Sequence, residues 1–190
     1  MACANWPMPH PHRPAQTDPM TDHALSRRLS YLLRHAPHEA GLTLAPGGWV
    51  PLAPLLSHLN VTRPQVEAVV AGSDKQRFSL RGDHIRANQG HSVPVDLQLH
   101  PSVPPALLYH GTHAGALPAS REGGLRPMNR HHVHLSPDPD TARRVGARRG
   151  PPIILTIRAG EMHAAGHVLF VSENGVWLVD MVPPAFIDGA

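Results

Sequence analysis

The order of apolar and polar residues predicts that the first structured element is a helix beginning near residue 21. Leucines recur at helical intervals after this point and form one apolar face, at Leu25, Leu29, Leu32 and Leu33. Thr21 or Asp22 can cap the start of this helix. Pro37 disfavours helical geometry in the residue before it, so the helix is predicted to end near His35.

The next apolar segments predict two more helices and then a β-hairpin. A helix is expected at 51–59, and Thr62 with Gln65 three positions later is typical of a capping box that starts another. Two short strands are expected at 77–80 and 84–87. Three helices followed by a hairpin are the outline of a winged helix, a fold often used to hold nucleic acid.

A proline-rich stretch separates this pattern from a different one. Residues 93–106 contain four prolines and no apolar period, so they are predicted to be a linker. Beyond it, strand-like runs occur at 107–110, 132–135, 153–158, 167–171 and 176–179. Short helical stretches are expected between them, near 113–122 and 138–147. The predicted fold class is therefore α+β, with a disordered tail (1–20), a winged-helix lobe (21–92), the linker and a second lobe (107–190).

The composition supports a folded protein and excludes several classes. Of 190 residues, 41% are hydrophobic and only 4% aromatic, so aliphatic side chains must build the core. Residues 1–20 are rich in proline and have no apolar period, which predicts disorder. No apolar run reaches the roughly 20 residues of a membrane span, and the first residues lack the layout of a signal peptide. A cytoplasmic location is predicted, and the single cysteine, Cys3, excludes an internal disulfide.

The charge of the chain is basic and is carried almost entirely by arginine. The formal net charge is +3, and Lys75 is the only lysine among 17 basic side chains. A GC-rich genome explains this preference without any function. The planar guanidinium nevertheless suits bidentate recognition of phosphate better than an ammonium group does, so the composition is compatible with a polyanionic partner.

Clusters of hydrogen-bonding side chains mark two segments of the first lobe as candidate sites. Arg34 and His35 stand at the predicted C-terminal end of the first helix, where cations also stabilise the helix dipole. The segment IRANQGHS places Arg86, Asn88, Gln89 and His91 beside Gly90. Such a stretch can be a solvated loop, but it also supplies the donors that a phosphate-binding loop needs.

These segments, with others further along, resemble the family of RNA 2'-phosphotransferases. The similar stretches are LSYLLRHAP, GLTL, GGWV, IRANQGHS, LLYHGT, GLRPMNRHHVHLS, RRVGARRG and SENGVWLVDMVPPAFI. They follow one another from about residue 24 to residue 187, which argues against chance agreement. The resemblance implies a winged-helix lobe for RNA followed by a lobe like the ADP-ribosyltransferases for NAD. It also implies a monomer.

The resemblance implies that the partners are RNA carrying an internal 2'-phosphate and NAD, which is consumed. The 2'-phosphate first attacks the anomeric carbon of the nicotinamide ribose, releases nicotinamide and gives 2'-phospho-ADP-ribosylated RNA. The adjacent 2''-hydroxyl then attacks phosphorus and releases 2'-OH RNA and ADP-ribose 1'',2''-cyclic phosphate. In fungi the family acts on spliced tRNA, which suggests a role in tRNA processing. No metal is expected, because arginine supplies the positive charge.

The family's phosphate-binding positions fall on residues of both lobes. Arg34, His35 and Arg86 match the positions that would orient the 2'-phosphate. Arg148, in VGARRG, matches a fourth essential position that would stabilise the second step, with Arg149 beside it as the alternative.

The family's NAD-binding positions fall in the second lobe. His110 would hydrogen-bond the nicotinamide ribose, and the backbone of Gly111 and Thr112 would hold the carboxamide. His134 would pack on the nicotinamide, and Val176 stands where many ADP-ribosyltransferases carry a catalytic glutamate. Ser136 and Asn174 are weaker candidates.

Alternatives to this hypothesis remain open from the sequence. An ADP-ribosyltransferase acting on another acceptor would share the fold and the use of NAD, but it would not need the phosphate-binding arginines. A non-catalytic winged-helix protein would leave the YHGT to NGVW half unexplained. His132 and His134 on one face of a strand could suggest a metal site, but two ligands without a nearby carboxylate or cysteine make a poor one.

Overall fold

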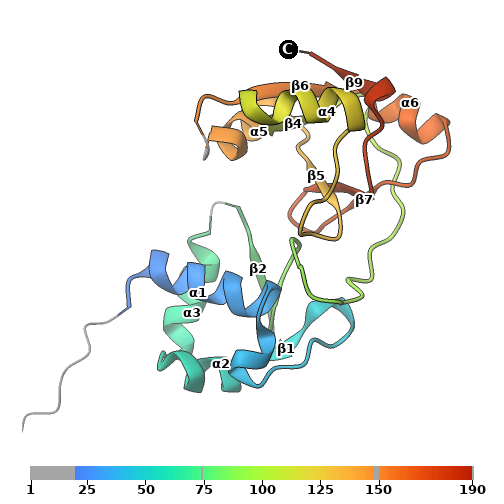
Figure 1. Cartoon of the computed structure of the whole chain (residues 1–190). Coiled ribbons are helices and arrows are strands. Elements are labelled where there is room, and N and C mark those ends of the chain that lie inside the picture. The colour runs from blue at the N-terminus through green and yellow to red at the C-terminus, as the bar shows by residue number, and fades with distance from the viewer. Residues whose placement is uncertain (1–19, 74, 148–149, 190) are drawn as a thin grey trace, which may run out of the picture.

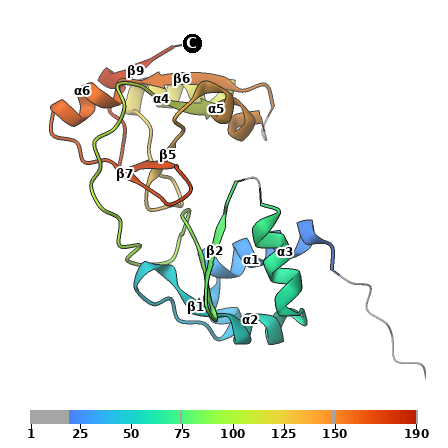
Figure 2. The ribbon, with the colours of Figure 1, turned by 180° about the vertical axis from the view of Figure 1, so that it is seen from behind.

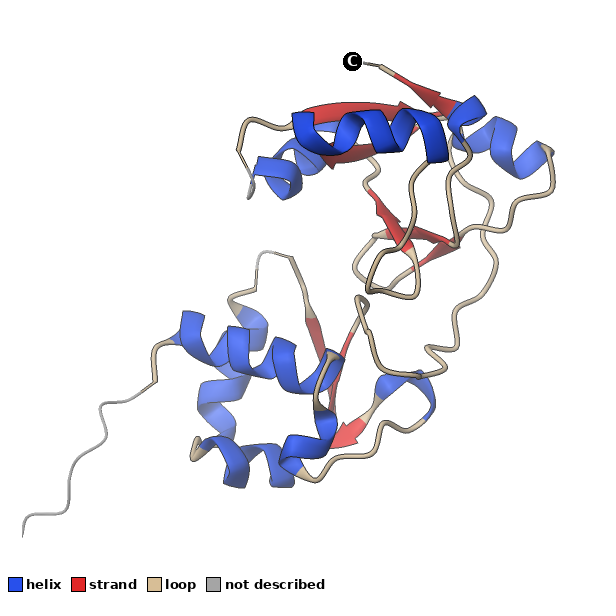
Figure 3. Cartoon of the chain, viewed as in Figure 1, coloured by secondary structure: helices blue, strands red, loops and turns tan. Residues whose placement is uncertain are grey.

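The chain forms two lobes joined by a long segment without regular structure, as the computed structural model shows (Figure 1). The structure describes residues 20–73, 75–147 and 150–189. Helices and small antiparallel sheets are mixed along the chain, which agrees with the predicted α+β class (Figure 3). Figure 2 shows the connecting segment from behind, passing beside the second lobe before it enters strand β4 (Leu108–Thr112).

Helix α1 (Asp22–Arg34) forms where the leucine spacing predicts it. Thr21 caps it, since its side chain accepts a hydrogen bond from the backbone N–H of Ala24 at 3.3 Å. The helix ends one residue before His35. All the leucines of the predicted apolar face, Leu25, Leu29, Leu32 and Leu33, are buried in the core of the first lobe.

The rest of the first lobe consists of helices α2 (Leu52–Leu59) and α3 (Arg63–Ala71) and strands β1 (Val50–Pro51), β2 (Phe78–Arg81) and β3 (His84–Ala87). The predicted capping box starts α3, with Thr62 N donating to Gln65 Oε1 at 2.8 Å. The strands pair antiparallel in the order β1-β3-β2. Arg86 therefore lies on the central strand of this sheet.

The second lobe contains two sheets that meet at one point. One has the order β4-β6-β9, with β6 at Ile153–Ile157 and β9 at Ile187–Asp188. The other has the order β5-β8-β7, with strands at Val133–Leu135, Trp177–Val179 and Phe170–Val171. A bridge between Tyr109 and Ser136 joins β4 to the end of β5, so the candidate residues of both strands are brought together.

Short helices cover the second lobe: α4 (Leu117–Gly123), α5 (Pro139–Gly146) and α6 (Ala159–Ala164). Short 3-10 turns lie at Pro37–Ala40, Pro46–Gly48, Ala114–Ala116 and Pro184–Phe186. Helix α5 packs directly on β4, because a Cβ atom added at Gly111 would overlap the carbonyl oxygen of Ala142 and lie 3.0 Å from Gly146 Cα. Within the described ranges, no helix is long and apolar enough to cross a membrane.

Candidate functional site

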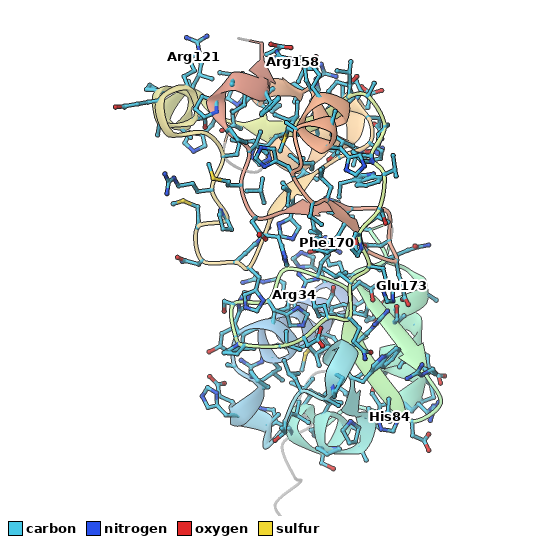
Figure 4. The ribbon with its side chains drawn as sticks, turned by 90° about the vertical axis from the view of Figure 1, so that its right-hand side faces the viewer. Arg34, His84, Arg121, Arg158, Phe170 and Glu173 are labelled. Atoms are coloured by element: carbon cyan, nitrogen blue, oxygen red, sulfur yellow. The ribbon has the colours of Figure 1, made fainter. Side chains whose placement is uncertain are left out.

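Arg34 lies at the edge of the first lobe that faces the second (Figure 4). Its guanidinium donates to the carbonyl of Arg77 at 3.4 Å and lies 6.0 Å from the centre of the Phe78 ring. A Cβ atom at Gly90 would lie 3.8 Å from the Arg34 guanidinium carbon, and Gly90 has a φ of 89°. The IRANQGHS segment therefore packs on Arg34 through a glycine in a left-handed conformation.

His35 follows Arg34 at the C-terminal end of α1 and is tied to the same segment. Its Nδ1 is 2.8 Å from Ser92 Oγ, and Ser92 N donates to the Arg34 carbonyl at 2.9 Å. Partial burial, and then the charges of Arg34 and Arg130, lower the pKa of His35 below its ordinary value. Arg130 belongs to the second lobe, so the two lobes approach each other at this histidine.

Arg86 is the most restrained of the predicted phosphate-binding residues. Its NH1 donates to the carbonyl of Gly47 at 3.2 Å, and its guanidinium carbon lies 4.6 Å from the centre of the Trp49 ring. Its NH2 forms an ion pair with Glu173 of the second lobe. Its buried Nε atom has no hydrogen-bond partner among the described residues. The side chain thus keeps a fixed orientation with a donor still unused.

Other donors of the IRANQGHS segment serve different purposes. Asn88 is buried, and its Nδ2 donates to the Gln76 carbonyl at 2.7 Å, so it supports the fold of the hairpin. His91 is only 1% exposed, and neither of its ring nitrogens has a hydrogen-bond partner in the described part of the chain. Burial and the nearby Arg34 lower the pKa of His91 to about 4, so it is a neutral imidazole at pH 7.

A small cavity lies where the two lobes meet. Its polar wall is formed by Gln89, Gly90 and His91 from the first lobe and His131, His132 and His134 from the second. Burial lowers the pKa values of both His91 and His134, and the positive charge of Arg34 lowers them further. Arg34, a candidate for phosphate, and His134, a candidate for NAD, are 100 positions apart in the sequence but share this region of the molecule.

His110 and His134 form a pair at the junction of the two sheets. His110 Nδ1 donates to the backbone carbonyl of His134 at 3.0 Å. Arg130 NH1 lies 3.1 Å from His134 Nδ1, while His134 Nε2 is buried and has no partner among the residues that the structure describes. Burial, with the charge of Arg130, lowers the pKa of His134 to about 3. Burial lowers the pKa of His110 as well. Both histidines are therefore neutral at pH 7, and His134 Nε2 is the N–H that remains for a ligand.

The edge of β4 beside this pair offers further backbone groups. Tyr109 and Ser136 exchange both backbone hydrogen bonds, at 2.9 and 2.8 Å. Backbone groups point alternately to the two sides of a strand, so the N–H and C=O of Gly111 point to the same side as those of Tyr109. Thr112, at the end of β4, is buried.

Asn174 and Val176 lie in the turn between β7 and β8. Asn174 Nδ2 donates to the carbonyl of Lys75 at 2.9 Å, across the gap between the lobes. Val176 N donates to Ser172 Oγ at 3.2 Å within the turn. Asn174 was predicted as a weaker cofactor-binding candidate, and its amide N–H here makes a contact between the lobes. Nothing in the sequence pattern indicated this contact.

Arg148 and Arg149, the candidates for the second step, lie outside the described residues. The same described ranges contain no group of three or more histidine, cysteine or carboxylate side chains that could hold a metal ion. Sequence reasoning missed Trp49, Arg130 and Glu173, which contact or lie near the candidate residues. They stand inside the recognised motifs GGWV, GLRPMNRHHVHLS and SENGVW, and that is the only signal that could have found them.

Comparisons with known proteins extend over nearly the whole described chain. Residues 20–181 match the model of the family described as "RNA 2'-phosphotransferase, Tpt1 / KptA family". A probable RNA 2'-phosphotransferase of Streptomyces griseus is 54% identical over 86% of this chain and 94% of its own length. One of Nostoc punctiforme is 52% identical, again over 86% and 94%. The resemblance seen in the sequence is thereby confirmed, and the chain belongs to the RNA 2'-phosphotransferase family, whose members are transferases.

Proposed function

We propose that this protein removes an internal 2'-phosphate from RNA by transferring it to the ADP-ribose part of NAD. The observation that carries the proposal is the meeting of two kinds of side chain at the boundary of the lobes. The fixed cations of Arg34 and Arg86 come from the first lobe, and the neutral pair His110 and His134 comes from the second. Membership of the RNA 2'-phosphotransferase family supports removal of a 2'-phosphate.

In the first step, an oxygen of the RNA 2'-phosphate forms a bond to the anomeric carbon of the nicotinamide ribose as the bond to nicotinamide breaks. This reaction needs the dianion held in line with the breaking bond. Arg34, His35 and Arg86 would provide that orientation. Arg86 is suited to it because its contacts with Trp49, Gly47 and Glu173 together keep the guanidinium in place before the substrate arrives.

The second lobe has the groups that a nicotinamide needs. A carboxamide requires one acceptor and one donor, and the N–H and C=O of Gly111 point to the side of β4 where Tyr109 meets Ser136. His134 Nε2 is a buried polar atom without a described partner beside this edge, which is typical of a group that awaits a ligand. Ser136 and Thr112 flank the same edge. These features fit NAD.

Val176 supports phosphate rather than a hydroxyl group as the nucleophile. A hydroxyl acceptor needs a base to remove its proton, and glutamate is the usual base at this position of ADP-ribosyltransferases. Val176 cannot act as a base, but a phosphate dianion needs none. In the second step, the 2''-hydroxyl attacks phosphorus and the RNA 2'-oxygen leaves. The extra negative charge at phosphorus would be stabilised by Arg148.

The deciding experiment follows the products of RNA carrying one internal 2'-phosphate, incubated with NAD. We expect nicotinamide, 2'-OH RNA and ADP-ribose 1'',2''-cyclic phosphate, and no nicotinamide from matched RNA that lacks the 2'-phosphate. ADP-ribose joined to the matched RNA, or to its ends, would instead show the alternative ADP-ribosyltransferase. Binding of RNA with no consumption of NAD would show a binding protein and refute the proposal.

A further inference from the structure

A carboxylate of the second lobe reaches into the phosphate-binding region of the first. Glu173 lies in the turn between β7 and β8, and Figure 4 shows it at the boundary of the lobes, beside the sheet that carries Arg86. Its Oε1 forms an ion pair with Arg86 NH2. Its Oε2 lies 3.0 Å from Ser79 Oγ, on the neighbouring strand, and the single O–H of Ser79 is shared between this oxygen and Asn88 Oδ1, at 2.7 Å. Both carboxylate oxygens are therefore bound to the first lobe.

The turn that carries Glu173 is held by its own hydrogen bonds. Ser172 is buried, and its side chain contacts Asn174 Oδ1 at 2.8 Å and accepts from Val176 N at 3.2 Å. Asn174 in turn donates to the carbonyl of Lys75 in the first lobe at 2.9 Å. The residues on both sides of Glu173 are thus fixed, so the carboxylate is presented to Arg86 from a defined position.

The pair of Glu173 and Arg86 differs from the surface ion pairs of this protein. The difference lies in the arginine: the Arg86 side chain is 13% exposed, whereas that of Arg63, paired with Glu67 on α3, is 42% exposed, and the Glu173 side chain is 60% exposed. A surface pair contributes little, because solvent screens it and its side chains are free to move. The hydrogen bond from Arg86 lowers the pKa of Glu173, and the bond from Ser79 adds to this effect, so the carboxylate is charged at pH 7.

The contacts of Arg86 restrain different parts of its guanidinium. Trp49 covers a face at 4.6 Å, Gly47 accepts from NH1 at 3.2 Å, and Glu173 accepts from NH2. A guanidinium has five N–H donors, so these contacts leave others for a phosphate. Glu173 is the restraint that comes from the second lobe, and the orientation of Arg86 depends through it on how the lobes are docked.

We propose that Glu173 is a positioning residue, which holds Arg86 in the orientation that receives the RNA 2'-phosphate and ties that orientation to the docking of the second lobe. The proposal rests on the function proposed above, since it takes Arg86 as a phosphate ligand. It assigns the carboxylate of the SENGVW motif to the phosphate site of the opposite lobe, and this carboxylate stands three positions before Val176, where many ADP-ribosyltransferases carry their catalytic glutamate.

The test compares the steady-state kinetics of wild type, Glu173→Ala and Glu173→Gln with 2'-phosphorylated RNA and NAD. Loss of the carboxylate lets Arg86 move, and we expect Glu173→Ala to raise KM for the RNA about tenfold, with KM for NAD changed less than about twofold. The glutamine amide oxygen can still accept from Arg86, so Glu173→Gln should recover most of the loss. Ser79→Ala removes the contact of Oε2, together with the hydrogen bond to Asn88 Oδ1, but leaves the ion pair of Glu173 with Arg86, so it should give a smaller rise.

Glu161→Ala is the matched control, because Glu161 pairs with Arg158 on the second lobe away from Arg86, and it should leave both KM values unchanged. Melting temperatures show whether each variant is folded. If Glu173→Ala does not fold, the KM values of Glu173→Gln and Ser79→Ala test the positioning role instead. Equal rises in both KM values, no change, or tighter RNA binding in Glu173→Ala would overturn the positioning role. Absence of turnover in wild type would refute the proposed function, and this inference with it.

Discussion

Arg34 stands at the end of α1, packs against Gly90 and lies close to the second lobe. If it binds the 2'-phosphate, Arg34→Ala should lower turnover of 2'-phosphorylated RNA about 10²–10³-fold, as expected for loss of one charge-stabilising donor. Arg34→Lys should retain more activity without restoring the full rate, because an ammonium cannot form the bidentate contact. Arg27→Ala, on the exposed part of the same helix, is the control. Turnover within a few-fold of wild type in Arg34→Ala would contradict the assignment.

The low pKa of His91 predicts how the free energy of unfolding depends on pH. Its pKa is about 4 in the folded protein and about 6.5 when unfolded, so only the unfolded state takes up a proton as pH falls below 6.5. Its stabilising effect is fully present above that pH and is lost toward pH 4. Between pH 7.5 and 5 the loss is on the order of 2 kcal/mol.

Urea unfolding of wild type and His91→Leu at pH 7.5 and at pH 5 measures the contribution of His91 to this loss of unfolding free energy. The variant should lose less unfolding free energy than wild type over the same interval, because leucine takes up no proton in either state. An equal loss in the two proteins would show that His91 is not held neutral by the fold.

The candidate residues of the site were predicted from the sequence, but their contacts were not. Arg34, His35 and Arg86 stand in motifs that resemble a known family, so their identity was available before the structure. Glu173 pairs with Arg86 from a position 87 residues later, between lobes that local patterns do not place relative to one another. The contact of Asn174 with the Lys75 carbonyl likewise depends on how the lobes dock, and no spacing of residues along the sequence indicates it.

At the scale of elements, prediction succeeded where the signal is local. The leucine spacing and Thr21 predicted α1, and Thr62 with Gln65 predicted the start of α3. Strands β1 and β9 and helix α6 were not predicted. The strands have two residues each and exist only through pairing with β3 and β6, and α6 has six residues, too few to show a helical period. The run 167–171 is a strand only at Phe170–Val171.

Because β4 packs directly on α5, adding a single methyl group at Gly111 should strongly destabilise the protein. Gly111→Ala places a methyl group against the Ala142 carbonyl, so strand and helix must separate. We expect a loss of about 1–3 kcal/mol or more, and hence a melting temperature lower by roughly 2–12 °C. Gly115→Ala is the control, because its Cβ would meet only the flexible His113 ring at 3.4 Å. Equal melting temperatures for the two variants would show that the strand and helix adapt.

At the scale of the whole molecule, the two steps of the proposed reaction would separate the roles of the lobes. Arg148→Ala should still let the 2'-phosphate displace nicotinamide, but 2'-phospho-ADP-ribosylated RNA should then accumulate. Loss of one charge-stabilising donor at phosphorus slows its conversion about 10²–10³-fold. Arg34→Ala should show little of this intermediate.

A time course of labelled 2'-phosphorylated RNA on a gel, with each variant, distinguishes these outcomes. Stalling by Arg149→Ala rather than Arg148→Ala would move the role to the neighbouring arginine. If neither variant stalls, this segment does not serve the second step.

Neutral histidines at the junction of the lobes have a consequence for kinetics. Burial lowers the pKa of His91 to about 4 and that of His134 to about 3, so these imidazoles carry no charge near neutrality. The positive charge of the proposed phosphate site then rests on arginines, which do not titrate in this range. The acidic limb of kcat/KM for RNA should therefore report the substrate's own second ionisation, near pH 6. Replacing the 2'-phosphate by a thiophosphate of lower pKa should shift that limb to lower pH, whereas a limb that stays in place would belong to the protein.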